Sequence, residues 1–176
     1  VLSSWRDRSS LVPKKAKHSI KVPRGGSLFD KKVAVVPFEH LETVLDRIWT
    51  IGSGERGWYY ANSLWEIRAF LDKLIGGPGT RGGRTSSQFL YPGLVVGFWR
   101  VLIADRINKK LLLSAELLLP GEAWLEFEVV ESSDSFLLIQ TATFRPKGIL
   151  GRIYWLAMLP FHFFLFNGML KALTRK

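Results

Sequence analysis

The chain contains one histidine in surroundings where its chemistry would matter. His162 lies in an apolar stretch beside three phenylalanines, Phe161, Phe163 and Phe164. A polar ring in such surroundings needs a hydrogen-bond partner. Four residues from the middle of the chain could supply one: Glu116, Glu126, Gln140 and Arg100. Such a cluster would be a candidate acid–base site, although a hydrogen-bonded core histidine, the commoner outcome, explains the same residues.

Metal and thiol chemistry are poorly supported. The chain has no cysteine, which excludes disulfides, thiol catalysis and cysteine-ligated zinc, and which fits a cytoplasmic protein. No two of the histidines His18, His40 and His162 have a metal-ligand spacing such as HExxH. We therefore expect no metal site. A nucleotide-binding fingerprint is also missing, so we expect no cofactor in this chain.

Residues 76–88 form a glycine-rich segment that carries Arg81 and Arg84. Backbone N–H groups exposed by glycines, together with two guanidinium groups, could hold an anion. The spacing matches neither a Walker loop nor a dinucleotide fingerprint, and the segment follows a predicted helix, whereas those motifs follow a strand. The alternative is a flexible lid or a long connection.

The aromatic residues are the stronger candidates for a binding site. Their bulk suits the walls of an apolar pocket that has a few polar anchors. The predicted ligand-binding residues are Trp58, Tyr60, Trp65, Trp99, Arg100, Trp124, Gln140, Tyr154, Phe161 and His162. The alternative for any single aromatic residue is that it only fills the core.

Positive charge is concentrated at the start of the chain. The formal net charge is +10, and residues 1–32 hold nine Lys and Arg residues against two Asp residues. This segment lacks a helical or strand period, which predicts a basic linker over residues 1–31 and a folded domain over residues 32–176. The linker could bind nucleic acid or anionic lipid. A solvated connector is the simpler explanation, so nucleic acid is not an expected partner.

Hydrophobic periodicity predicts the elements that position these residues. A short strand is predicted at Val33–Val36, and apolar residues at helical spacing predict a helix from Leu41 to Ile48. A second helix of about twelve residues is predicted between Ser63 and Ile75, with a capping box at its start and glycines at its end. Four strands then follow, over residues 95–104, 110–118, 122–131 and 135–144. Their short connections indicate an antiparallel meander, in which Trp124 shares a face with glutamates.

The last apolar stretch, residues 149–173, is as long as a long helix and is apolar nearly all round. Such a helix must be covered by a sheet or lie in a bilayer. Pro160 should kink or break it, which suits a helix bent across a curved sheet better than a straight span. We therefore predict an α+β fold, in which a curved antiparallel sheet wraps around the C-terminal helix and two shorter helices follow the first strand. Spanning the membrane and peripheral membrane contact through a partly exposed aromatic end are the alternatives.

Several motifs resemble those of a known family. They are GWYYANSLWEIRAFLDKLIGGPGTRGGR (57–84), FWRV (98–101), LPGEAWLEFEV (119–129), QTATFRPKGILGRIYW (140–155) and LPFHFFLFNGM (159–169). Together they resemble an uncharacterised domain found at the C-terminus of bacterial NmrA-like, atypical short-chain-dehydrogenase proteins that bind NAD(P). That family looks like a member of the START-like, polyketide-cyclase superfamily, which has the helix-grip fold. The resemblance covers roughly residues 31–173.

The resemblance implies a cavity between sheet and helix that holds a hydrophobic small molecule. It also implies a preceding NAD(P)-binding domain as a partner, with any NAD(P) site upstream of this chain. It transfers no catalytic residue. The leading hypothesis is a non-catalytic, cytoplasmic ligand-binding domain appended to a dehydrogenase-like protein, and the alternative is a cyclase-like or hydrolase-like enzyme domain that uses His162.

Overall fold

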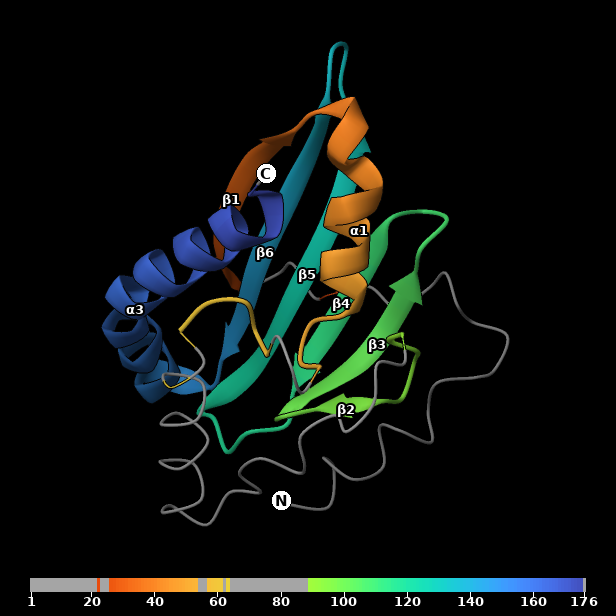
Figure 1. The fold of residues 1–176 in the computed structure, drawn as a ribbon. Helices are drawn as coiled ribbons and strands as arrows, with labels where there is room; N and C mark the ends of the chain where they lie inside the picture. The colour runs from red at the N-terminus through yellow and green to blue at the C-terminus, as the bar shows by residue number, and fades with distance from the viewer. Residues whose placement is uncertain (1–21, 23–25, 54–56, 62, 64–88, 176) are drawn as a thin grey trace.

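An antiparallel sheet of six strands forms the frame of the structure (Figure 1). The computed structural model describes residues 22, 26–53, 57–61, 63 and 89–175. In chain order the elements are β1 (Leu28–Val36), the 3-10 helix η3 (Phe38–His40), α1 (Leu41–Trp49), β2 (Val95–Val96), β3 (Trp99–Asp105), β4 (Lys110–Ala115), β5 (Gly121–Glu131), β6 (Phe136–Pro146) and α3 (Gly148–Thr174). The strand order is β1-β6-β5-β4-β3-β2. Strands β2 to β6 thus form the predicted meander, and β1 pairs with β6 at the far edge.

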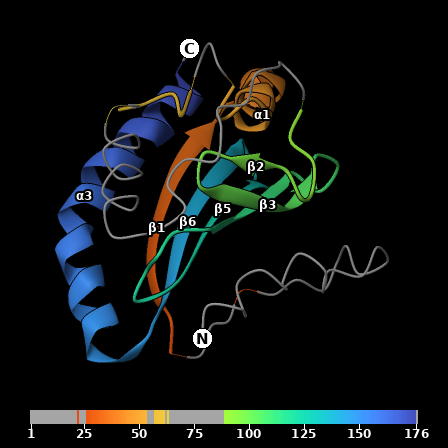
Figure 2. The same cartoon turned by 90° about the horizontal axis from the view of Figure 1, so that it is seen from below.

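Helix α3 lies along one side of the curved sheet, over β1 and β6 (Figures 1 and 2). It buries seven residues, which repeat at helical spacing: Gly151, Trp155, Leu165, Phe166, Met169, Leu170 and Leu173. Gly151 permits the close approach at the start of the helix, because a Cβ there would clash with the carbonyl oxygen of Pro120 and with Pro146. This is the helix-grip arrangement that the order of elements predicts. The helix continues through Pro160, so the proline does not break it.

Strand β1 begins at Leu28, inside the segment predicted as a basic linker. The boundary placed at Lys32 is therefore four residues too late. The error has a physical cause: β1 is an edge strand with one exposed face, and Phe29, Lys31 and Val33 point to solvent while the residues between them are partly buried. Its alternation mixes charged and apolar residues, so it lacks the apolar run that marked Val33–Val36.

The predicted strand over residues 95–104 is in fact a hairpin of two strands. Val96 pairs with Trp99 in the antiparallel ladder of β2 and β3. The turn between them is possible because Gly97 has a positive φ of 62°. No polar turn residue marks this reversal, since the apolar Phe98 fills the other turn position and is buried.

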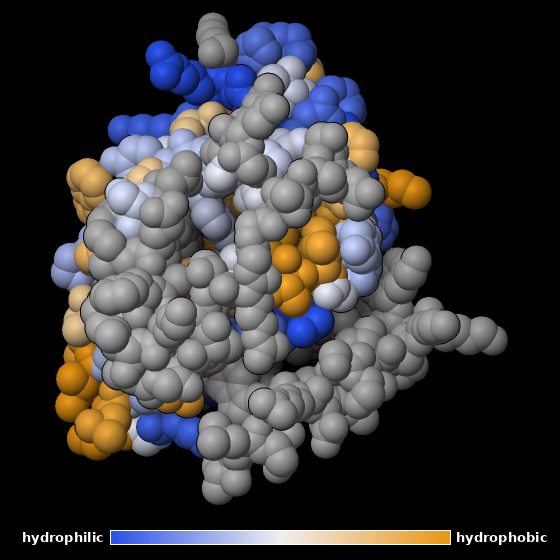
Figure 3. All heavy atoms as spheres, turned by 60° about the horizontal axis from the view of Figure 1, so that its bottom comes forward, coloured by the Kyte–Doolittle hydropathy of each residue, from blue (hydrophilic) through white to orange (hydrophobic). Residues whose placement is uncertain are grey.

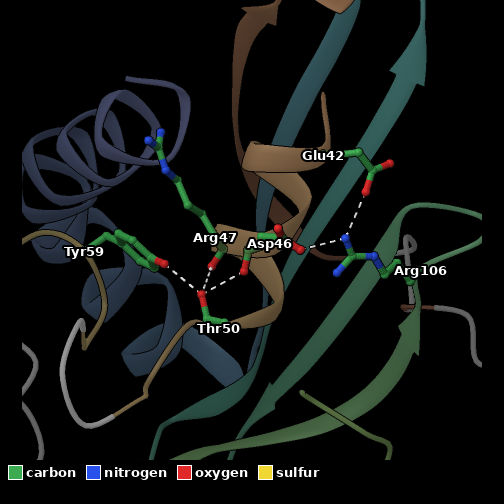
Figure 4. Close-up of polar contacts among 6 residues, drawn as sticks. All are labelled: Glu42, Asp46, Arg47, Thr50, Tyr59 and Arg106. Atoms are coloured by element: carbon green, nitrogen blue, oxygen red, sulfur yellow. Dashed lines mark hydrogen bonds and ion pairs between the residues drawn. The ribbon is translucent and has the colours of Figure 1, made fainter. Parts of the chain in front are cut away.

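Helix α1 connects the sheet to the end of α3 (Figure 4). Arg106, in the β3–β4 connection, donates hydrogen bonds to Asp46 at 2.7 Å and to Glu42 at 3.0 Å. These carboxylates, Asp46 first, raise the pKa of Arg106. On another side of α1, Arg47 donates from Nη1 to the carbonyl oxygen of Leu173 at 3.0 Å and also to that of Arg175. A cation at the carbonyl end of a helix is stabilising, so α1 fixes where α3 ends.

Several predictions fall outside the described residues. They are the second helix beyond Ser63, Trp65 within it, the glycine-rich segment with Arg81 and Arg84, and most of the basic linker.

Candidate ligand cavity

A cavity of about 90 Å³ lies between the concave face of the sheet and α3. The sheet contributes small side chains from three adjacent strands, Ala115, Ala123 and Ala142, and larger ones beside them. The full lining is Phe98, Trp99, Ala115, Leu117, Leu119, Ala123, Trp124, Ala142, Thr143, Phe144, Tyr154, Trp155, Met158, Phe161, His162, Leu165 and Phe166. The empty space lies over the three alanines, because their side chains are the smallest on this face of the sheet and do not reach α3.

Stacked aromatic rings fill most of the gap between sheet and helix. Phe144 of β6 stacks on Trp155 of α3, with 5.7 Å between ring centroids and an interplanar angle of 7°. Tyr154 lies 5.4 Å from the same phenylalanine. His162 contacts Trp155 edge-on at 5.0 Å and stacks on Phe166 at 4.8 Å. These contacts hold the histidine ring in a fixed orientation beside the cavity.

His162 lines the cavity, and its environment keeps its imidazole uncharged at neutral pH. Burial lowers its pKa to about 4; Asp30 of β1 opposes this shift and Lys32 adds to it. Its Nδ1 atom is buried and has no hydrogen-bond partner among the described residues. A buried polar atom without a partner costs free energy, and this one belongs to a residue that lines a largely apolar cavity.

The partners predicted for His162 lie elsewhere. Arg100 and Glu116 form an ion pair with each other, and Arg100 alternates with the core residues Trp99 and Val101, so its side chain leaves the sheet on the opposite, convex face. Glu126 binds Lys110 at 2.5 Å on that convex face. The predicted acid–base cluster is therefore not assembled around the histidine. The strand alternation that places Arg100 outside was already visible in the sequence.

Gln140 faces the concave side of β6 but does not line the cavity. It is fully buried, and within the part of the chain that the structure describes both its Nε2 and Oε1 atoms lack hydrogen-bond partners. Its register neighbours are Lys32 of β1 and Phe127 of β5. It is a second unpartnered polar group beneath α3, outside the cavity itself.

The predicted aromatic residues divide into lining and supporting groups. Trp99, Trp124, Tyr154 and Phe161 line the cavity with His162. Trp124 alternates with Ala123, which packs against the core cluster, and with Leu125, which belongs to it, so strand alternation directs its side chain to the convex side. Trp58 packs 6.3 Å from Trp99.

Tyr60 supports α3 from the other side. It lies 5.9 Å from Phe164 and covers Gly168, where a Cβ would clash with its ring. The next residue, Ala61, has a φ of 50°, an uncommon conformation for a residue with a side chain. The hydroxyl of Tyr59 bonds to that of Thr50 at 2.8 Å, which fixes the same segment to the end of α1 (Figure 4).

Sequence reasoning missed the three alanines and several apolar residues of α3, including Met158 and Leu165. A signal for the alanines existed. Each stands at a concave-face position of a predicted strand, where its neighbours on the same face are large. A run of small residues across adjacent strands leaves space under a covering helix.

The chain matches one protein-family model over residues 24–169, described as a protein of unknown function, DUF2867. The chain belongs to this family. No curated protein matches it. The resemblance stated from the motifs thus agrees with a family of uncharacterised domains, whereas the preceding NAD(P)-binding domain is not shown.

The DUF2867 domain is also similar to solved structures at low identity. Norcoclaurine synthase from Thalictrum flavum, solved with dopamine and hydroxybenzaldehyde, is 15% identical, covers 89% of this chain and 93% of its own, and has a TM-score of 0.44. A protein from Nitrosomonas europaea is 13% identical over 87% and 94% of the two chains, with a TM-score of 0.43. A protein from Thermobifida fusca is 14% identical over 85% and 91%, with a TM-score of 0.41.

The described residues contain no group of three or more His, Asp or Glu that could hold a metal ion. The cavity offers apolar surface, ring faces and one neutral imidazole. A base with a pKa of about 4 is a weak proton acceptor at neutral pH.

Proposed function

We propose that this DUF2867 domain binds a small hydrophobic molecule between its sheet and α3. The observation that carries the proposal is a largely apolar, aromatic-lined cavity whose lining includes His162, a residue with a buried Nδ1 atom that has no partner among the described residues. Ligand sites combine apolar walls with a few placed polar groups. A ligand hydroxyl could donate to this nitrogen or accept from it, which would remove the cost of leaving it unpaired.

The size of the cavity limits the ligand. Its volume of about 90 Å³ is well below the roughly 300–1,000 Å³ of pockets for drug-sized ligands. A compact aromatic molecule suits the space as it stands. A larger ligand requires α3 or the aromatic side chains to move apart, and the exposed outer side of α3 leaves room for that movement.

The first experiment is native mass spectrometry of the purified full chain, followed by denaturing extraction of any bound molecule. It is paired with NMR titrations of two probes of nearly equal shape, phenol and toluene. We expect phenol to bind roughly fivefold more tightly than toluene, as one buried hydrogen bond would give. The reporter resonances are the indole N–H groups of Trp99 and Trp155.

The matched control is His162→Phe, which keeps a ring between Trp155 and Phe166 but removes the nitrogen. In this variant the preference for phenol should disappear while toluene still binds. If neither probe binds the natural protein and no molecule copurifies, the proposal fails. Equal preference for phenol in both proteins would show that the histidine does not recognise the hydroxyl.

The wider setting is a second part of the proposal. The resemblance of the motifs supports a cytoplasmic parent protein in which an NAD(P)-binding, short-chain-dehydrogenase-like domain precedes this one, so that the cofactor site lies upstream. Translation of the reading frame upstream of the codon for Val1 tests it, because a glycine-rich dinucleotide fingerprint after a strand is then expected there.

A further inference from the structure

The outer side of α3 exposes many apolar side chains. Six large apolar residues of this helix are between 57% and 74% exposed: Ile149, Leu150, Ile153, Leu156, Phe163 and Phe164. Ile149, Ile153, Leu156 and Phe163 are spaced by four, three and seven residues, which aligns them in one stripe along the helix. Figure 3 shows apolar surface on the left side of the molecule, where α3 lies in Figure 1.

An exposed apolar stripe of this extent indicates a binding surface. Among the described residues, α3 is the helix long and apolar enough to cross a membrane by length and composition, and 22% of an apolar 18-residue stretch of it is buried in the domain. The seven residues that it buries belong to the core of the domain. Spanning would expose that core face, so a position flat on a surface suits the helix better than a position across a bilayer.

The positive charges around the stripe indicate that its binding partner is anionic. Exposed cations stand near both ends of α3: Lys147, Arg152, Lys171 and Arg175. Lys32 of β1 lies with its Nζ 5.2 Å from the Phe163 ring, and its charge is paired with Asp30 at 3.1 Å. Helix α3 contains no Asp or Glu, and the chain as a whole carries a net charge of +10. Basic residues beside exposed Phe and Leu are typical of helices that bind anionic membrane surfaces.

A second copy of the chain fits the stripe less well. In a twofold pair, α3 would face α3 either with like ends or with opposite ends together. Both ends carry cations and neither carries a carboxylate, so each arrangement brings positive charges together. An anionic lipid headgroup layer would instead neutralise them.

We propose that the DUF2867 domain docks on anionic membrane surfaces through the outer stripe of α3, with the helix lying in the plane of the interface. The proposal does not depend on a ligand in the cavity. It places the cavity, which lies on the other side of the same helix, next to a lipid phase where hydrophobic molecules dissolve.

The test is sedimentation of the full chain with two kinds of vesicle. One is pure phosphatidylcholine, and the other contains in addition about 30% phosphatidylserine, an anionic lipid. We compare the natural protein with the double variant Leu156→Ser/Phe163→Ser. The matched control is Ile107→Ser/Phe89→Ser, which also removes one exposed aliphatic residue and one exposed phenylalanine. The control positions lie in the β3–β4 connection and just before β2, away from α3 in Figure 1. All variants keep the basic linker.

We expect the natural protein and the control to bind anionic vesicles. The affinity of the α3 variant for the same vesicles should be lower by roughly tenfold or more. Arg152→Gln/Lys171→Gln should weaken binding to anionic vesicles selectively and keep the apolar stripe. Equal binding by the α3 variant would assign the affinity to the basic linker and overturn the proposal. So would failure of the natural protein to bind, or a dimer in light scattering that the α3 variant dissociates.

Discussion

His162 couples the stability of the domain to pH through its burial. Its folded pKa is about 4, whereas an unfolded histidine titrates near 6.5. Below pH 6.5 His162 is therefore protonated in the unfolded chain, whereas in the folded chain it is protonated only near pH 4. The contribution of neutral His162 is complete above pH 6.5 and is lost as the pH falls towards 4.

We expect the free energy of unfolding to fall by about 1.4 kcal/mol per pH unit through this window on account of His162, or on the order of 3 kcal/mol in all. Urea denaturation at a series of pH values from 4 to 7 measures it. In His162→Phe the same series should lack this slope, because no proton is taken up at that position. If both proteins show the same pH dependence, the histidine is not held neutral by the fold.

At this scale the sequence correctly indicated that His162 lies among apolar rings, but the partners that it suggested lie elsewhere. A single histidine within an apolar helix can be recognised in the sequence, and its need for a hydrogen bond follows from its surroundings. Which face of a strand Arg100 and Glu126 occupy depends on register, and a shift of one residue moves a side chain to the other face. The alternation around Trp99 and Val101 gives the correct face for Arg100 once those residues are taken as core.

At the scale of elements, the long helix and the central strands were predictable because each has a strong period. Strands β4, β5 and β6 lie within a few residues of the predicted ranges. Strand β1 and the β2–β3 hairpin were missed in part, because an edge strand carries charged residues on its exposed face and because Gly97 reverses the chain without a polar turn. The contact between α1 and the end of α3 joins residues 126 positions apart, and no local pattern encodes it.

That contact leads to a prediction about α3. Replacing Arg47 by Met keeps the aliphatic stem and removes the hydrogen bonds to the carbonyl groups of Leu173 and Arg175. We expect a loss of about 1–2 kcal/mol in urea denaturation and faster amide exchange in the last turn of α3. The control is Arg106→Met, which breaks exposed ion pairs with Glu42 and Asp46 and should cost less than about 1 kcal/mol. Equal losses, with no change in exchange at the helix end, would contradict a specific role for Arg47.

For the molecule as a whole, the order of strands and helices was enough to predict a sheet gripping a helix. It was not enough to predict how the gap between them is filled, because that depends on how stacked rings such as Phe144 and Trp155 share the space left by the alanines. A cavity in a packed core costs stability. A domain that keeps one at its centre therefore gives up stability that a larger residue would restore, which is a common compromise at binding sites.

This compromise can be measured by filling the cavity from the sheet. Ala142 lines it and is almost fully buried. Replacing Ala142 with Leu, or with the smaller Val where Leu is too large, should raise the free energy of unfolding by up to about 2 kcal/mol, given a cost of roughly 24 cal/mol per Å³ of cavity. The same change should abolish the binding of phenol and toluene, because it occupies their space. The control is Ala104→Val, at a partly buried position that packs against the core outside the cavity. It should neither raise the free energy of unfolding nor abolish the binding of phenol and toluene. A filled variant that still binds both probes would place their site elsewhere in the molecule.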